Sequence, residues 1–308
     1  MACAQGALAK LAVKEASGDI TWSTGTVIPI PFARESLQKR AHIGHPDVII
    51  GTRGEVSERA RFSPYFYGGW IVFHLSPGHA ATVFPWALGA DASGTTYDLA
   101  ETLQTFGVLV DKVTGVHEFF DGYISRMIIS GKQNGPGGPP NFITCAIQCI
   151  FKSYNGPGSA DSYPSLTYAV TGEYTPLIFE DAVLTLGSAT EIKSFNLDIN
   201  NHIEPRYVNS LTPTALCPTR RTVTLTTISP YDSGTSALYD LTVTGVASTK
   251  TLAITNGSTS ITATFGSLQV DTQTPVVDGK HEINLQLQMA ARSLSTTPAV
   301  SFAIDSTP

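Results

Sequence analysis

The chain has 308 residues, of which 42% are hydrophobic and 14% are charged, and its formal net charge is −6. This length suits one large β domain or two ordinary ones, and the abundance of Thr, Ser and Gly favours β structure. The negative charge excludes tight nucleic-acid binding through clustered Lys and Arg, because such binding depends on the release of phosphate counterions. No segment approaches the roughly 20 apolar residues that cross a bilayer, so no membrane partner is expected.

Residues 1–50 are predicted to form an extended N-terminal arm. Prolines interrupt the apolar run "TGTVIPIPF" and exclude a central strand there, while "ARESLQKRAH" favours a short charged turn of helix. The segment has too little periodic apolar pattern for a core of its own, so we expect it to order against a neighbouring subunit. Residues 51–308 are predicted to form the main domain, starting with an alternating strand in "GTRGEVSERARF".

The best helical candidate is "SPGHAATVFPWALG". Ser76 is suited to cap the helix, Pro77 fits the first helical position and Gly89 follows the end. Pro85 should keep this helix short or kinked.

Strands and loops dominate the remainder of the chain. We predict strands in "DGYISRMIISGK", "FITCAIQCIF", "PSLTYAVTGEY", "LIFEDAVLTLG", "RTVTLTTISP", "ALYDLTVTGV", "KTLAIT", "SITATFGSLQV", "EINLQLQMAA" and "AVSFAIDS". No charged or low-complexity linker divides the chain, so the predicted fold is mainly β: a β sandwich with one short helix.

Four cysteines are present, and none forms a metal-type Cys-x-x-Cys pair. Alternation places Cys145 and Cys149 on the apolar face of one strand. Residues four apart on a strand lie roughly 13 Å from one another, so we predict buried free thiols there.

One strand has an unusual wet face. Alternation in residues 194–200 predicts that Phe195, Leu197 and Ile199 face the core. The opposite face then carries only small, neutral or acidic side chains, namely Ser194, Asn196, Asp198 and Asn200.

The sequence contains no pattern typical of catalysis or of cofactor or metal binding. His42 and His45 with Asp47, and His117 with Glu118, are isolated combinations that lack further ligands or partners. Neighbouring carboxylates at 180 and 181 would point to opposite faces of a strand, or lie at a turn, and do not suit a glycosidase. We therefore predict no enzyme, no cofactor and no metal site, and we expect the aromatic cluster "FSPYFYGGWIVF" to fill a core or subunit contact.

Several segments, in order, resemble the tail tube (major tail) proteins of long-tailed bacteriophages. They are "FDGYISRMIIS", "PLIFEDAVLTLGSATEIKSFNLDINNHIEPRY" and "YDLTVTGVASTKTLAIT", followed by "FGSLQVDTQTPVVDGKHEINLQLQMAA". The family pattern falls on Tyr123 and on residues 176–181, 195–201 and 275–279, and the resemblance covers roughly residues 50–308.

The resemblance implies a structural virion protein made in the host bacterial cytoplasm. Six copies would form a ring, and an inner sheet of each would join a multi-subunit β-barrel tube. Rings would stack into the tail tube, and double-stranded DNA would pass through it without tight binding. The face with Ser194, Asn196, Asp198 and Asn200 would line this channel. The implied partners are further copies, the tape measure protein, and the tail terminator and tail tip proteins.

Two other classes share the β-rich profile without enzyme motifs. One is a different virion protein, such as a head decoration or adhesin, which would not polymerise head to tail. The other is a carbohydrate-binding or carbohydrate-active β protein, which an export signal and a cleft with carboxylates on one face would favour.

Overall fold

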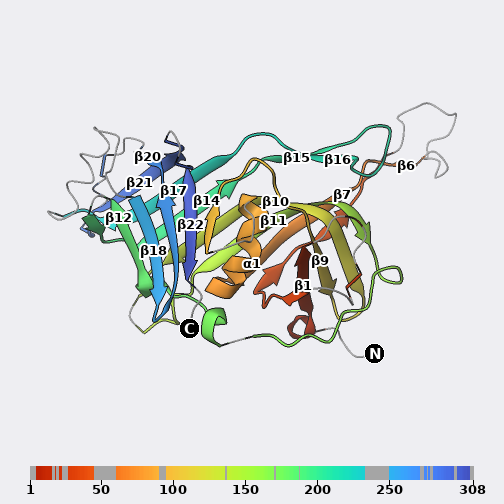
Figure 1. Ribbon diagram of the computed structural model, residues 1–308, viewed down its shortest axis with the longest axis horizontal. Coiled ribbons are helices and arrows are strands. Elements are labelled where there is room, and N and C mark those ends of the chain that lie inside the picture. Colours follow the sequence, from red (N-terminus) through yellow and green to blue (C-terminus); the bar gives the residue numbers. More distant parts are fainter. Residues whose placement is uncertain are drawn as a thin grey trace.

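The computed structural model describes residues 5–15, 18, 21–22, 27–44, 60–89, 95–135, 137–169, 171–186, 188–232, 250–270, 274–275, 277, 280–294 and 297–305. Two β-sheets pack into a sandwich with one α-helix, as the sequence predicts (Figure 1). Across these ranges no helix has the length and apolar character needed to cross a membrane.

The larger sheet contains twelve strands, and neighbouring strands in it run antiparallel. Its main row runs in the order β2 (Ile28–Pro29), β1 (Lys10–Glu15), β9 (Phe106–Asp111), β10 (Val116–Lys132), β14 (Ser194–Asn200), β17 (Thr222–Pro230), β21 (Asn284–Arg292) and β20 (Ser267–Val270). On the other side of β10 lie β11 (Thr144–Asn155), β7 (Phe66–His74), β3 (Arg34–Glu35) and β4 (Gln38–Arg40).

The smaller sheet has six strands, in the order β13 (Ser188–Thr190), β12 (Ala182–Leu186), β18 (Lys250–Asn256), β19 (Thr259–Phe265), β22 (Val300–Asp305) and β8 (Thr96–Asp98). The chain passes from β19 into β20 of the larger sheet at Gly266, where an added Cβ would lie 2.5 Å from the carbonyl oxygen of Pro298. Two short hairpins stand apart: β5 (Ile43–Gly44) with β6 (Arg61–Phe62), and β15 (Ile203–Arg206) with β16 (Ala215–Pro218).

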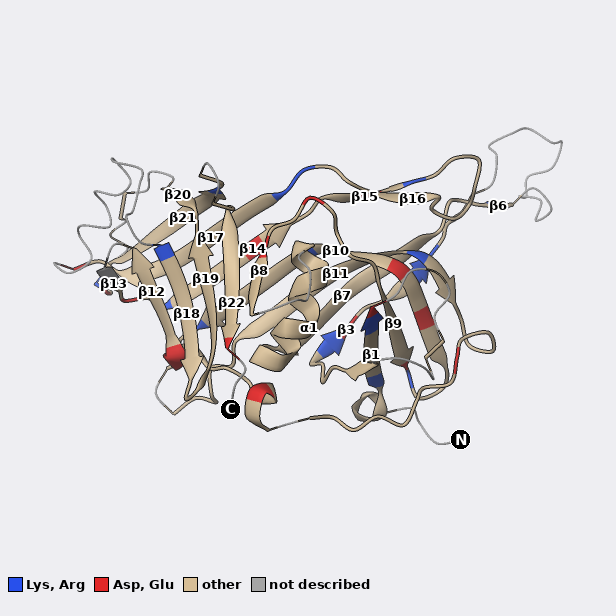
Figure 2. Cartoon of the chain, viewed as in Figure 1, with Lys and Arg blue, Asp and Glu red and all other residues tan. Residues whose placement is uncertain are grey.

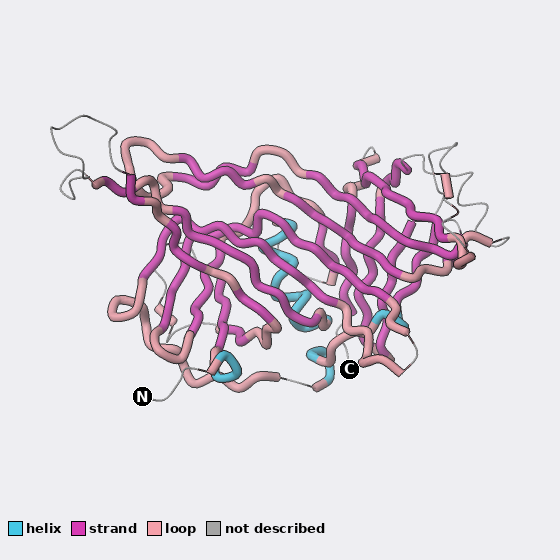
Figure 3. Tube along the Cα trace, turned by 180° about the vertical axis from the view of Figure 1, so that it is seen from behind, coloured by secondary structure: helices cyan, strands magenta, loops and turns pink. Residues whose placement is uncertain are grey.

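The one α-helix in the described part of the chain, α1 (Pro77–Leu88), has the predicted ends. The Ser76 hydroxyl accepts a hydrogen bond from the backbone N–H of His79, and Gly89 ends the helix in a left-handed conformation. Pro85 lies within the helix, which continues to Leu88. The helix lies against the core, where Phe84 contacts Phe302 of the smaller sheet and Trp86 stacks on Phe106 of the larger one. Seen from behind, the larger sheet lies in front of the helix (Figure 3).

Strand β10 is the branch point of the larger sheet. Residues 116–122 pair with β9 and residues 126–132 pair with β14, while β11 follows the opposite edge of β10. The register shifts between Ile124 and Arg126, which marks a β-bulge where the partner changes. The sheet therefore divides beside one continuous strand.

The described part of residues 1–50 belongs to the larger sheet. Leu11, Ala12 and Val13 of β1 are fully buried, and β1 pairs with β9 along its whole length. Strand β1 therefore packs within its own subunit, while the contact of the arm with a neighbouring subunit and the domain boundary at residue 50 stay predictions.

The following segment connects two distant edges of the same sheet. The backbone N–H of Ile30 donates to the carbonyl oxygen of Leu11 in β1, and that of Ala33 donates to the carbonyl oxygen of Val72 in β7. Residues 34–40 continue along β7 as β3 and β4, so the predicted helical turn in "ARESLQKRAH" is wrong. Competition from the open edge of β7 explains this, because tertiary pairing overrides a weak helical propensity.

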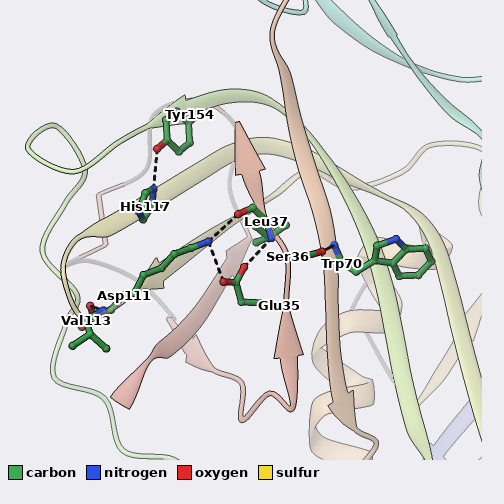
Figure 4. Close-up of polar contacts among 9 residues, drawn as sticks. Glu35, Ser36, Leu37, Trp70, Asp111, Val113, His117 and Tyr154 are labelled. Atoms are coloured by element: carbon green, nitrogen blue, oxygen red, sulfur yellow. Dashed lines mark hydrogen bonds and ion pairs between the residues drawn. The ribbon is translucent and has the colours of Figure 1, made fainter. Parts of the chain in front are cut away.

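Glu35 and Leu37, at the corner between β3 and β4, lie close to Asp111 at the end of β9 (Figure 4). Lys112, the residue after Asp111, joins this corner to β9. Its ammonium lies 3.0 Å from Glu35 Oε1 and donates to the carbonyl oxygen of Leu37 at 2.9 Å. Glu35 in turn accepts from the backbone N–H of Leu37. This ion pair and these hydrogen bonds hold the segment on the sandwich within a single chain.

Most other predicted strands are confirmed, with local exceptions. "PSLTYAVTGEY" forms no strand in its described residues and ends in a short 3₁₀ helix, η3 (Gly172–Tyr174). In "LIFEDAVLTLG" the strand begins only at Ala182, after a 3₁₀ turn, η4 (Phe179–Asp181). "ALYDLTVTGV" and all but the last three residues of "GTRGEVSERARF" lie outside the described residues.

Deleting residues 1–40 should unfold the protein. Leu11, Val13, Ile30 and Leu37 are buried, and such side chains contribute roughly 1.5–3 kcal/mol each, comparable in sum to a typical total stability of about 5–15 kcal/mol. Circular dichroism and the urea unfolding transition measure the effect, with Lys112→Met as a milder disruption of the same segment. A truncated protein that unfolds cooperatively at the wild-type urea midpoint would contradict this packing.

A second prediction concerns β17, where the buried hydroxyl groups of Thr227 and Ser229 have no hydrogen-bond partner among the described residues. Phe195 and Leu287 lie directly opposite Thr227 on the two neighbouring strands. Thr227→Val should therefore stabilise the fold by about 1 kcal/mol, because it removes an unsatisfied polar group without a large change of volume. Thr224→Val, at a half-buried position on the other face of β17, is the matched control and should show no such gain in urea unfolding.

Candidate functional site: the polar face of the larger sheet

Strand β14 has the predicted two faces. Phe195, Leu197 and Ile199 are each at most 2% exposed, while Asn196 is exposed. Ser194, Asp198 and Asn200 are partly buried on the same side as Asn196. The core face is thus confirmed, and the role of the other face as a channel lining stays a prediction.

The polar face extends over the neighbouring strands, because residues directly opposite one another in a sheet share a face. Asn196 lies between Ser130 of β10 and Thr226 of β17, and Thr226 lies opposite Gln288 of β21. Few charged residues colour these central strands (Figure 2). The hydroxyl and amide side chains placed on this face by the register are Ser130, Thr144, Gln148, Ser194, Asn196, Asn200, Thr222, Thr224, Thr226, Ser267, Gln269, Asn284, Gln286 and Gln288.

Asp198 is paired with a cation that sequence reasoning missed. Arg126 of β10 donates from Nε to Oδ1 of Asp198 at 2.9 Å and from Nη2 to Oδ2 at 2.6 Å. The pairing is diagonal, since Arg126 lies opposite Asn200 and Asp198 lies opposite Ile128. The hydrogen bonds to Asp198 raise the pKa of the Arg126 guanidinium. The carboxylate is therefore not a free acidic group on the face.

The two asparagines at the end of β14 have different roles. Asn200 caps the following turn by accepting from the backbone N–H of His202, which has a positive φ of 45°. Asn201 is 2% exposed, and its amide donates at 2.9 Å to the carbonyl oxygens of Ala87 in α1 and Ile124 in β10. Its Oδ1 accepts from Arg221 at 2.7 Å. Asn201 therefore links the end of α1 to β10 at the point where the larger sheet divides.

A groove of about 690 Å³ lies at the other end of the polar face. Ser194 and Asn196 line it from β14, and His74 lines it from β7. Asn134 and Asn141 contribute from the loop after β10, which Asn141 holds by accepting from the backbone N–H of Asn134 and donating to Glu180. The lining combines these neutral polar side chains with apolar ones, such as Phe142 and Ile228, and with Lys132.

The described members of the isolated combinations considered from the sequence have structural partners or surroundings of their own. His117 bonds to the hydroxyl of Tyr154, and burial lowers its pKa, whereas Glu118 is buried and accepts from Trp22 Nε1. Asp181 lies beside Glu180 on a 3₁₀ turn, and burial, followed by the Glu180 charge, raises its pKa. His42 is exposed, and its proposed co-ligands at 45 and 47 lie outside the described residues.

A buried Ser76–His79 pair resembles a nucleophile and base only in its residue types. The Ser76 hydroxyl lies 2.7 Å from His79 Nδ1, but both residues are buried, and burial lowers the pKa of His79 to about 4. Ser76 is already used as the helix cap. Among the described residues no group of three potential metal ligands was found.

The free cysteines also match the prediction from alternation. Cys145 and Cys149 are buried and unpaired, and burial raises the pKa of both thiols. A high pKa suppresses the reactive thiolate, so these two residues serve as core side chains. The aromatic cluster is likewise partly in the core, with Tyr67 and Phe73 buried, while Phe62 is exposed.

Comparison with known protein families decides the identity. The family described as phage tail tube protein matches residues 67–300, which is more than half of the chain. The chain belongs to this phage tail tube protein family. It is therefore a structural component of the phage tail and of the virion, a role consistent with the lack of an enzyme motif. A search of curated proteins found no match.

In this tail tube protein, the family motif at residues 195–201 contains two kinds of asparagine, one that faces solvent and one that is buried in the fold. The motif at the end of β14 joins the solvent-facing Asn196 to the buried Asn201 within six residues. Sequence spacing alone could not distinguish the two asparagines, because Asn201 forms its hydrogen bonds with Ala87 and Ile124, which are distant in the chain.

Asn201→Ala should destabilise the subunit strongly, whereas Asn196→Ala should not. Each buried polar group left unpaired costs roughly 1–3 kcal/mol, and this substitution removes the partner of two carbonyl groups and of Arg221. Urea unfolding of the two variants compares a buried and an exposed asparagine of the same motif. Equal unfolding midpoints for the two variants would show that the hydrogen bonds of Asn201 do not stabilise the subunit.

Proposed function

We propose that this tail tube protein assembles into hexameric rings that stack into a tube, and that the polar face of the larger sheet lines the channel for double-stranded DNA. Family membership supports the assembly. The single observation that carries the assignment of the channel face is the breadth of the neutral polar surface beside β14, with its apolar residues on the opposite side.

A neutral polar lining suits the passage of DNA. Duplex DNA carries one charge about every 1.7 Å along its axis, so clustered Lys and Arg would hold it by releasing counterions. Hydroxyl and amide groups remain hydrated and offer DNA no comparable electrostatic gain. The face would therefore guide the genome without binding it tightly.

The edges of the larger sheet provide a route to a ring. β20 lies at one end of the row, and a strand at an edge presents unpaired backbone groups that pairing with another copy would satisfy. Contacts between unlike surfaces close into a ring when the rotation per subunit allows it. Joined in this way, the inner sheets of six subunits would form the multi-subunit β-barrel.

Other tail components complete the proposal. The tape measure protein would occupy the channel before the DNA, and the terminator and tip proteins would contact the two ends of the tube. Synthesis would take place in the cytoplasm of the host bacterium. The family match favours this function over a head decoration, an adhesin or a carbohydrate-binding protein.

Assembly and the orientation of the sheet can be tested together by cysteine labelling. In a protein with Cys3 and Cys217 changed to Ser, Asn196→Cys should react in free subunits with both a small maleimide and a bulky polyethylene-glycol maleimide. Once electron microscopy shows tubes, the small reagent should still react, whereas the bulky one should be excluded by the narrow channel.

Val183→Cys is the matched control, because Val183 is 50% exposed on β12 of the smaller sheet, which would lie outside the channel. It should react with both reagents before and after assembly. Continued labelling of Asn196→Cys by the bulky reagent in intact tubes would place the polar face elsewhere. Failure of concentrated protein to form rings or tubes, with no such tube in the parent virion, would contradict the assembly itself.

A further inference from the structure

Arg126 is the exceptional residue on the polar face. On β14, β17, β21 and the paired part of β10, the register places four ionisable side chains on this face: Lys132, Arg292, Arg126 and Asp198. Lys132 and Arg292 are exposed at strand ends, whereas Arg126 lies in the middle of β10. An unpaired arginine there would present a permanent positive charge to a polyanion.

The geometry of the pair uses the same donors that would bind a phosphate. A guanidinium recognises carboxylate and phosphate groups alike through two parallel N–H donors. In Arg126 these donors, Nε and Nη2, are both engaged by the two oxygens of Asp198. The carboxylate therefore occupies the bidentate position and also cancels the charge.

Stability alone gives only a small reason for this pair. The side chains of Arg126 and Asp198 are 38% and 20% exposed, and ion pairs in such settings typically contribute little to stability. The β10–β14 register is already held by the backbone ladder from Arg126 to Lys132. The effect of the pair on a passing polyanion is the larger consequence, because it would be repeated in every subunit.

We infer that Asp198 masks Arg126 against DNA, so that a face containing an arginine remains non-adhesive. The inference rests on the proposed function for the biological identity of the polyanion, but the masking itself is a property of the single subunit. Asp198 is thus a specificity-determining residue: it excludes phosphate from a guanidinium that would otherwise bind it.

Four full-length proteins test the mask: the wild type, Asp198→Asn, Arg126→Gln and the double variant. Asp198→Asn keeps the side-chain shape and frees the arginine, so it should bind linear duplex DNA at low salt more tightly than the wild type. The salt slope should steepen by about 0.9 for each engaged subunit, which corresponds to a further 3–4-fold loss of affinity between about 50 and 200 mM salt. Arg126→Gln and the double variant should bind no better than the wild type.

The double variant separates charge from misfolding. It carries the same substitution at Asp198 without the arginine, so a gain of binding in Asp198→Asn that persists in the double variant would overturn the mask. Equal binding by Asp198→Asn and the wild type, with matching urea unfolding curves, would overturn it as well. Cosedimentation of DNA with the soluble subunits measures all four proteins before any tube is formed.

Genome ejection from particles that carry the same substitutions then distinguishes the mask from the proposed channel. Slow ejection by Asp198→Asn that added salt and Arg126→Gln both relieve supports the two together, since salt screens the exposed charge. If the subunit of Asp198→Asn binds DNA but its particles eject normally, the mask stands, while the assignment of this face to the DNA channel is overturned.

Discussion

The continuous strand β10 is the constraint on which the rest of the architecture depends. It is bonded to β11 on one edge and, in succession, to β9 and β14 on the other, so it holds the two halves of the larger sheet in one register. A sheet that divides in this way leaves backbone groups without ladder partners at the fork. Asn201 satisfies one of these, the carbonyl of Ile124, and the end of α1 fills the adjoining space. The hydrogen bonds of Asn201 therefore stabilise the point at which the larger sheet divides.

The two faces of the larger sheet follow from that register. Once Met127 and Ile129 of β10 point to the core, their neighbours Arg126, Ile128 and Ser130 must point away. The backbone ladder carries the same alternation onto β14, β17 and β21. A one-residue slip would exchange the two surfaces completely, so the apolar core specifies the position of the polar face without any direct contact between them.

Sequence patterns predicted the parts of this fold that depend on local periodicity. Strands β14, β21 and β22 alternate apolar and polar side chains through most of their length, and α1 has a capping serine and a terminal glycine, so these elements could be identified without tertiary information. Strands β3 and β4 could not, because they are short and follow the edge of β7 rather than an apolar pattern of their own. The same holds for β1, whose burial depends on β9, nearly a hundred residues away.

The candidate site shows the same division between local and tertiary information. The core and solvent faces of β14 could be read from alternation, but the partner of Asp198 could not. Arg126 precedes it by 72 residues, and the diagonal reach across two strands becomes apparent only when the neighbour and register of β14 are known. Alternation therefore places the Asp198 carboxylate on the polar face but does not reveal its neutralisation by Arg126.

Neutrality of a surface can arise from the absence of charge or from the pairing of charges, and the polar face uses both. Hydroxyl and amide groups cover most of it, and they resist apolar association as well as phosphate binding because they remain well hydrated. The Arg126–Asp198 ion pair adds two opposite charges, and their electric fields nearly cancel at distances larger than the separation of the two groups. Such a pair is neutral only while both partners remain, so a single substitution there changes the net charge of the face, whereas exchanges among Ser, Thr, Asn and Gln elsewhere on it do not. The electrostatic character of the whole face is consequently most sensitive at this one diagonal contact.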